Sequence, residues 1–198
     1  MKKYQIIYAD PPWSYGTSKL NRPSGGKEIT DHYPVMEDAD ILALPVKELA
    51  HRHCWLFLWV VYAKLPLALE VIKTWGFKYA TVGFEWFKLT TTGLPVCFMG
   101  GSVCGGAIEL CLIGKRGNLP RASKRVHRLI EAPRHKHSRK PPEIRQRIVQ
   151  LVGDVPRIEL FSRKEELLFD ADYTNGWDIW GNEVDSDIEL QEGKICTT

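Results

Sequence analysis

The sequence predicts an α/β fold, a three-layer sandwich with a mainly parallel sheet. Short apolar runs typical of buried strands alternate along the chain with amphipathic segments of helical period. A chain of 198 residues with 44% apolar content can bury one substantial core. We therefore expect a single domain over residues 1–184, followed by an acidic, poorly ordered tail over residues 185–198.

The first predicted strand lies almost at the N-terminus, over residues 4–9, and is rich in β-branched and aromatic side chains. The segment 14–34 has no periodicity and many Gly, Ser and Pro residues, which indicates a mobile loop. Further strands are predicted at 55–60, 79–88, 107–113 and 157–163, and helices at 36–50 with a break at Pro45, 64–75 and 143–152. No helical pattern separates 79–88 from 107–113, so these two strands are expected to pair antiparallel.

The charge distribution is strongly asymmetric. Residues 115–147 contain twelve Lys or Arg residues and two Glu residues, whereas acids predominate from residue 154 onwards. Such a basic segment attracts a polyanion, although a solvated loop is the alternative. The residues expected to contact a nucleic acid substrate are Tyr15, Tyr33, Lys115, Arg116, Arg121, Lys124 and Arg125.

Cysteine usage and the absence of targeting signals bound the cellular setting. The five cysteines show no C-x-x-C spacing, so buried free thiols in a reducing compartment explain them best, and no metal site is expected. The sequence has no run of 18 apolar residues and no secretory leader. We therefore expect a soluble, cytoplasmic protein.

Asp10-Pro11-Pro12-Trp13 is the stretch around which the candidate site is built. It follows the first predicted strand directly, and open α/β sheets bind ligands at the carboxyl ends of their strands. Because two prolines remove two N–H groups, we expect the Asp10 and Pro11 carbonyls to have no neighbouring donor in the turn. These acceptors and the Trp13 indole suit a flat heterocycle with an exocyclic amine. The alternative is a proline-terminated strand with a capping Asp10 and Trp13 in the core.

This tetrapeptide resembles the catalytic motif of methyltransferases that act on the N6 amine of adenine, and the wider pattern resembles the MT-A70 family. Two later blocks carry the same resemblance, the Ser138-Arg139-Lys140-Pro141 block and the segment 158–163 with 177–183. The resemblance implies a Rossmann-like class I methyltransferase fold with a permuted motif order, in which the catalytic strand precedes the cofactor-binding strand. Asp10, Pro11, Pro12 and Trp13 would be the catalytic residues.

The resemblance also implies S-adenosylmethionine as cofactor, bound by Asp10, Lys140, Glu159, Arg163, Asn182 and Glu183. In this hypothesis Lys140 pairs with the methionyl carboxylate, Asp10 accepts from the ammonium group and Glu159 holds the ribose hydroxyls. The expected reaction is methyl transfer to adenine N6 in DNA.

Three alternatives stay open at this point. The same reaction on RNA is one, because a basic segment attracts either backbone equally. A catalytically silent nucleic-acid-binding partner is the second, and methylation of cytosine or of a protein glutamine is the third. The sequence is compatible with a homodimer or a heterodimer.

Overall fold

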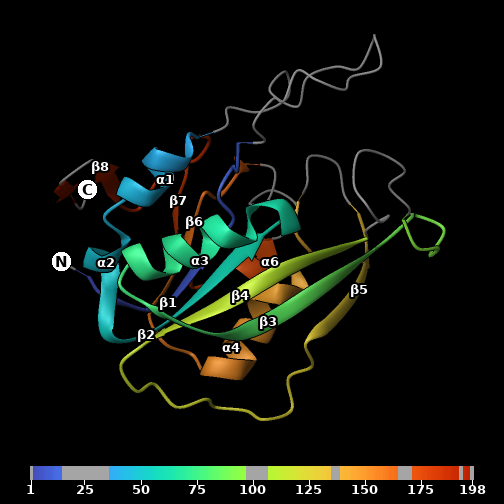
Figure 1. The fold of residues 1–198 in the computed structure, drawn as a ribbon. Helices are drawn as coiled ribbons and strands as arrows, with labels where there is room; N and C mark the ends of the chain where they lie inside the picture. The colour runs from blue at the N-terminus through green and yellow to red at the C-terminus, as the bar shows by residue number, and fades with distance from the viewer. Residues whose placement is uncertain are drawn as a thin grey trace, which may run out of the picture.

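The computed structural model describes residues 2–14, 36–96, 107–134, 139–164, 171–191 and 194–196 (Figure 1). The strands are β1 (Tyr4–Ala9), β2 (Ala50–Val60), β3 (Lys78–Leu89), β4 (Ile108–Arg116), β5 (Leu129–Pro133), β6 (Arg157–Leu160), β7 (Asp178–Trp180), β8 (Glu189–Gln191) and β9 (Lys194–Cys196). The helices are α1 (Asp38–Ala43), α2 (Val46–Leu49), the 3-10 turn η2 (Tyr62–Lys64), α3 (Leu65–Thr74), α4 (Glu143–Val152) and α6 (Ala171–Thr174).

The main sheet has seven strands in the order β5-β3-β4-β2-β1-β6-β7, and β8 pairs with β9 separately. Strand β4 runs antiparallel to β2 and β3, which confirms the predicted pairing, and every other neighbouring pair is parallel. The carboxyl ends of β1, β2, β3, β5, β6 and β7 therefore meet at one edge of the sheet. We call this the carboxyl edge, and the opposite one the amino edge.

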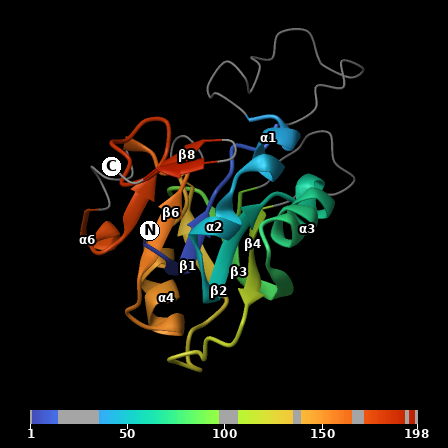
Figure 2. The same cartoon turned by 90° about the vertical axis from the view of Figure 1, so that its left-hand side faces the viewer.

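Helices cover both faces of the sheet, so the predicted three-layer α/β fold is confirmed (Figures 1 and 2). One buried cluster joins α1, α2 and α3 to the sheet through residues such as Ile41, Leu49 and Ile72. A second cluster on the other face contains Ile144 and Ile148 of α4. The apolar period of each helix matches the face that it buries.

The predicted helices and most strands have the expected positions. Helix α4 coincides with the predicted 143–152, and the predicted 64–75 corresponds to α3, which Gly76 follows at φ +84°. Such a φ is accessible mainly to glycine, which explains why the helix ends there. None of the described helices has the length and apolar character needed to cross a membrane.

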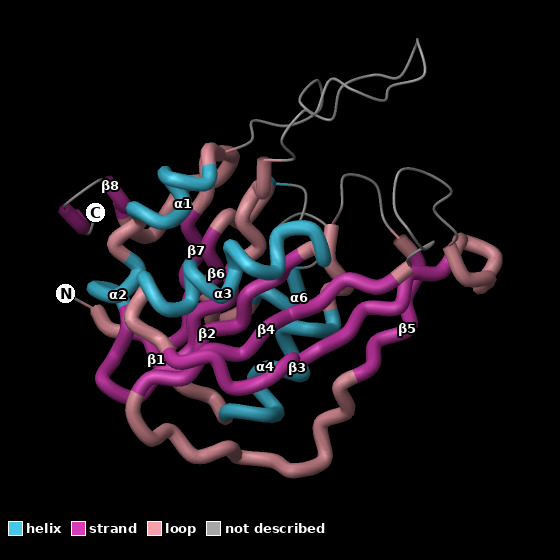
Figure 3. Tube along the Cα trace, viewed as in Figure 1, coloured by secondary structure: helices cyan, strands magenta, loops and turns pink. Residues whose placement is uncertain are grey.

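Strand β5 was not expected, because its residues lie within the basic segment (Figure 3). Ile130 and Ala132 are buried, whereas Leu129, Glu131 and Pro133 are exposed. Two inward-facing apolar side chains give only a weak alternating pattern, so the sequence indicates this strand poorly. Parallel pairing with β3 makes this segment a strand, and that pairing is a tertiary interaction.

The tail also differs from the expectation in its described part, since Ile188 and Leu190 are buried in the cluster beneath α1, α2 and α3. The Asp187 N–H donates to the Ile179 carbonyl (3.0 Å), and the Asp187 carboxylate accepts from the Ile179 N–H (2.8 Å). Asp187, which the sequence suggests is a solvated surface charge, thus forms hydrogen bonds with the edge strand β7.

Two of the cysteines are buried free thiols, as expected. Cys54 on β2 and Cys111 on β4 are inaccessible, and burial raises the pKa of the Cys54 thiol to about 12. Burial also raises the pKa of Cys111 well above its ordinary value. Both are therefore poor nucleophiles at neutral pH.

Candidate active site

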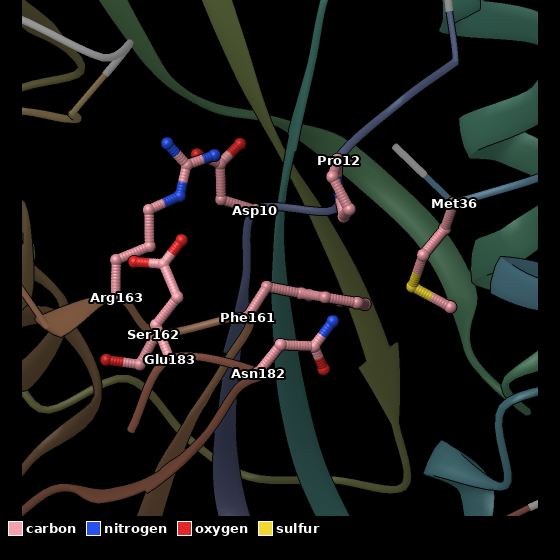
Figure 4. A pocket seen from close by; sticks show the side chains of 8 residues that line it. All are labelled: Asp10, Pro12, Met36, Phe161, Ser162, Arg163, Asn182 and Glu183. Atoms are coloured by element: carbon pink, nitrogen blue, oxygen red, sulfur yellow. The ribbon is translucent and has the colours of Figure 1, made fainter. Parts of the chain in front are cut away.

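A cleft opens at the carboxyl edge, where β1, β6 and β7 end (Figure 4). Ala9 lies beside Leu160, and Leu160 lies beside Trp180, so the residues after these three strands come together although they are far apart in sequence. The cleft is lined by Asp10, Pro12, Met36, Phe161, Ser162, Arg163, Asn182 and Glu183.

Asp10 is held by a network of buried charges behind the cleft. Lys140 Nζ donates to Asp10 Oδ2 at 2.7 Å and lies 3.3 Å from Glu109 Oε2. Lys88 donates to Glu109 in turn. Two carboxylates and two ammonium groups thus alternate through the end of the sheet. Because buried charges are tolerated when each has a partner, this network gives Asp10 a defined orientation.

The network favours the charged forms of Glu109 and Lys140. Burial by itself would raise the pKa of Glu109, but Lys140 and Lys88 outweigh it and lower that pKa. Burial would lower the pKa of Lys140, but Asp10 and Glu109 outweigh it and raise that pKa. An ammonium of raised pKa holds the Asp10 carboxylate throughout the neutral range.

We expect Glu109→Gln to flatten the loss of stability in acid. A glutamate of lowered pKa binds its proton more readily in the unfolded chain, so its contribution to stability is present above the ordinary value of 4.5 and is lost as the pH falls through the folded pKa. Removing one titrating group changes the slope of the free energy of unfolding against pH by at most about 1.4 kcal/mol per pH unit. Urea unfolding of both proteins from pH 6 to pH 3 measures this difference. If the free energy of unfolding varied with pH in the same way for both proteins, Glu109 would not be coupled to Lys140 and Lys88.

The turn after β1 is tighter than the sequence indicates. The Trp13 N–H donates to the Pro11 carbonyl (2.8 Å), so the expectation that this carbonyl has no donor in the turn is wrong. The Met36 N–H donates to the Pro12 carbonyl (3.1 Å), which ties the turn to the segment before α1. A carbonyl has two lone pairs, and Pro11 therefore retains capacity for one more donor.

Trp13 faces the core and does not present an open stacking surface. Only 6% of it is exposed, and its indole N–H donates to the Trp59 carbonyl at 3.0 Å. Trp59 Nε1 donates to the Tyr8 hydroxyl (2.7 Å), so the turn is anchored to β2 and β1. Trp13 thus lies in the core beneath the turn, the position that the alternative interpretation of the sequence predicted.

Glu159, expected at the ribose, is buried in an ion pair with Arg145. Arg145 Nε and Nη2 donate to the two carboxylate oxygens at 2.7 and 2.6 Å, and both residues are almost inaccessible. Glu159 therefore lies beneath the cleft and is absent from its lining. A bidentate pair of this kind joins α4 to β6.

The backbone after β6 is held in an uncommon conformation. Phe161 has φ +67°, in the left-handed region that phenylalanine rarely adopts. A Cβ at Gly181 would lie 2.1 Å from the Ser162 carbonyl oxygen, so only glycine allows the two cleft segments to approach this closely. Strained residues of this kind are frequent at binding sites.

Ser162 is the most informative residue that the sequence interpretation did not single out. It is 1% exposed and lines the cleft, and no described group forms a hydrogen bond with its Oγ. Buried hydroxyls normally have a partner, which a bound ligand would supply.

Ser162→Ala is therefore expected to leave the free energy of unfolding unchanged or slightly higher, while the affinity for S-adenosylmethionine falls. The loss of one neutral hydrogen bond corresponds to about 0.5–1.5 kcal/mol, roughly a twofold to tenfold increase in Kd. Calorimetric titration and thermal unfolding measure the two quantities. A less stable variant with unchanged affinity would show that the hydroxyl has a structural partner instead.

The predicted site residues divide into three groups in the structure. Asp10, Pro12, Arg163, Asn182 and Glu183 line the cleft, and Pro11, Lys140, Glu159 and Trp13 lie directly behind it. Tyr15 and Tyr33 lie outside the described residues.

The third group, the basic residues of the predicted substrate surface, lies at the other end of the sheet. Lys115 is beside Trp55 and Trp55 is beside Ile6, near the start of β1, whereas Asp10 follows its end. Lys115, Arg116, Arg121, Lys124 and Arg125 therefore lie at or beyond the amino edge, away from the cleft. The predicted antiparallel direction of β4 already implies this position, because β4 ends at the edge where its neighbours β2 and β3 begin.

Two residues that support the site, Arg145 and Glu109, were not predicted, although the sequence carries a signal for each. Arg145 occupies the apolar stripe of α4 with Val149 and Val152, and a charge at such a position indicates a buried pair. Glu109 similarly interrupts an apolar strand at its first buried position. Met36 carries no comparable signal.

A mainly parallel sheet with a charged cleft at its carboxyl edge, beside an Asp-Pro-Pro turn, is consistent with a Rossmann-like methyltransferase. The MT-A70 family profile matches residues 4–183, and the chain belongs to this family.

Curated relatives agree with this assignment. The type II methyltransferase M.MunI of Mycoplasma sp is 30% identical over 98% of this chain and 84% of that protein. The N(6)-adenine-specific methyltransferase METTL4 of Homo sapiens is 26% identical over 92% of this chain and 38% of that protein. The human N(6)-adenosine-methyltransferase catalytic subunit METTL3 is 27% identical over 92% of this chain and 28% of that protein. The chain thus spans most of the Mycoplasma protein and a minor part of the human ones.

Proposed function

We propose that this protein transfers a methyl group from S-adenosylmethionine to the N6 amine of adenine in DNA. The observation that carries the proposal is the Asp10 carboxylate, oriented by Lys140 at the head of a cleft with polar and charged side chains. The similarity to a type II methyltransferase along almost the whole chain supports DNA as the substrate.

The lining of the cleft fits this cofactor chemically. S-adenosylmethionine combines a carboxylate, an ammonium group and ribose hydroxyls, and when bound it supplies an activated methyl group on a sulfonium. Arg163 offers a guanidinium for the carboxylate, Asp10 offers a carboxylate for the ammonium, and Asn182 and Glu183 can bind hydroxyls. The buried Ser162 hydroxyl adds a further hydrogen-bonding group on the same wall.

The chain's own contribution to the reaction is to hold the amine. The N6 lone pair is delocalised into the adenine ring, so the amine is a weak nucleophile until its hydrogens are bound. Asp10 and the second lone pair of the Pro11 carbonyl can accept these hydrogens and favour the tetrahedral nitrogen of the transition state. Little acid or base strength is needed, because the methylated ammonium loses a proton readily.

Lys140 acts as a positioning residue in this proposal. Lys140 is 7% exposed and its ammonium binds Asp10 and Glu109, so in this proposal its main role is to orient Asp10. Rigid placement of a reacting group can supply a large part of the barrier reduction.

In this proposal Tyr15 or Tyr33 stacks on the target base, since Trp13 is in the core. In duplex DNA the adenine must leave the stack before it reaches the cleft.

Methyl transfer from labelled S-adenosylmethionine to matched DNA and RNA, followed by nucleoside mass spectrometry, tests the proposal. We expect N6-methyladenine in DNA. Product in RNA alone would establish the RNA alternative. Cofactor binding without product from either polymer would point to a missing partner, and the absence of cofactor binding would favour a silent nucleic-acid-binding subunit.

A further inference from the structure

Six exposed basic side chains begin at the amino edge of the sheet, at the end opposite the cleft, and continue along the loop from β4 towards β5. We call this group the basic face, and it consists of Lys78, Lys115, Arg121, Lys124, Arg125 and Arg128. Lys78 begins β3, Lys115 is near the end of β4, and the other four lie on the loop between β4 and β5. The loop leaves the amino edge before Arg128, whose carbonyl accepts from the Glu85 N–H in the middle of β3. This loop runs along the lower side of the molecule in Figures 1 and 3.

The loop has no helix or strand but is attached to the fold along its length. The Trp55 indole donates to the Leu119 carbonyl (3.0 Å), and the Ala122 N–H donates to the Leu151 carbonyl at the end of α4 (2.8 Å). Arg147 of α4 donates to the carbonyls of His127 (3.2 Å) and Leu129 (2.8 Å). The basic side chains therefore project from an ordered backbone, and a ligand would not have to order it.

Lys78 and Lys115 extend this group onto the sheet. They are directly opposite each other in the β3–β4 ladder, so their side chains are on the same face. Lys115 Nζ lies 3.8 Å from the centre of the Trp55 ring, which places both lysines on the face that carries the loop. Like charges opposite one another destabilise a sheet, and a bound anion removes that cost.

In the part of the chain that the structure describes, the charges of the basic face are not neutralised. Among the described residues, no carboxylate forms an ion pair with any of its six members, and Asp154, which follows α4, is bound by Arg157. Several fixed positive charges with exposed ends suit the repeated phosphates of a nucleic acid backbone.

We propose that the basic face is a second, non-catalytic docking surface for duplex DNA, separate from the methyl-transfer cleft. From Glu109 near the cleft to Lys115 on the basic face, β4 spans about 20 Å at roughly 3.4 Å per residue. A duplex that touches both must cover at least about six base pairs at a 3.4 Å rise. The surface thus retains DNA through its backbone while the cleft samples bases. This rests on the proposed DNA substrate.

The test is the salt dependence of binding to a 24-base-pair duplex of arbitrary sequence, by fluorescence anisotropy. For Lys124→Gln with Arg125→Gln, we expect the slope of log K against log salt to fall by about 2, because each phosphate contact contributes about 0.9. The matched control is Lys47→Gln with Lys73→Gln, two exposed lysines on α2 and α3 at the opposite face. The control should keep the wild-type slope.

An unchanged slope in the Lys124 and Arg125 variant, or an equal fall in the control, would overturn the proposal. A fall seen with an RNA hairpin and not with DNA would overturn the assignment to DNA. In methylation of plasmid DNA the same variant should raise KM more than it lowers kcat. Binding is measured without turnover, so failure of the proposed reaction would appear separately, as absence of methylation by the wild-type protein that still binds the duplex.

Discussion

Replacing Asp10 with asparagine is expected to reduce methyl transfer by about 10²–10³-fold, the loss typical when one preorganised group that stabilises a transition state is removed. The side chain keeps its shape but loses its charge, so it binds both the amine hydrogens and Lys140 more weakly. Initial rates at saturating nucleic acid and cofactor measure the effect.

Asp40→Asn on α1 is the control, because this carboxylate is exposed and absent from the cleft. Its rate should equal that of the wild type. Calorimetry with S-adenosylmethionine separates the two roles of Asp10, since loss of the ammonium contact raises Kd, whereas loss of the amine contact lowers kcat. An Asp10→Asn enzyme with nearly full kcat would refute the mechanism.

Removing one partner of the Arg145–Glu159 pair is expected to destabilise the fold by about 3–5 kcal/mol, because a buried charge loses its counterion. Arg145→Met leaves the Glu159 carboxylate without its two hydrogen bonds beneath the cleft. Arg145→Met combined with Glu159→Leu should recover most of this stability, since an apolar pair of similar volume avoids desolvation of both ions.

Urea unfolding of the two single variants and the double variant gives the coupling energy of the pair. Cofactor affinity of the double variant decides whether Glu159 has a second role. A cofactor affinity near that of the wild type would mean that Glu159 only stabilises the fold. A large loss of cofactor affinity in a stable double variant would support the predicted contact of Glu159 with the ribose. Additive losses in the cycle would show that the pair does not act as a unit.

Much of this protein could be predicted from local patterns. The strand at Tyr4–Ala9, helix α4 and the break before α2 follow from apolar period, proline and glycine, all of which act over a few residues. The cleft residues Asp10, Arg163, Asn182 and Glu183 were found because each directly follows a predicted strand or lies in a block that resembles the family.

What depended on partners distant in sequence could not be predicted. Trp13 is in the core because Trp59 offers a carbonyl, and Glu159 is buried because α4 supplies Arg145. The position of the basic segment differs from these two cases, since the predicted antiparallel direction of β4 carries it to the amino edge. By itself the sequence determined which side chains the protein has for the reaction and roughly where its strands end. The tertiary structure decided which of them face the cleft, because strand order, strand direction and the partner of each buried charge are set by contacts between distant segments.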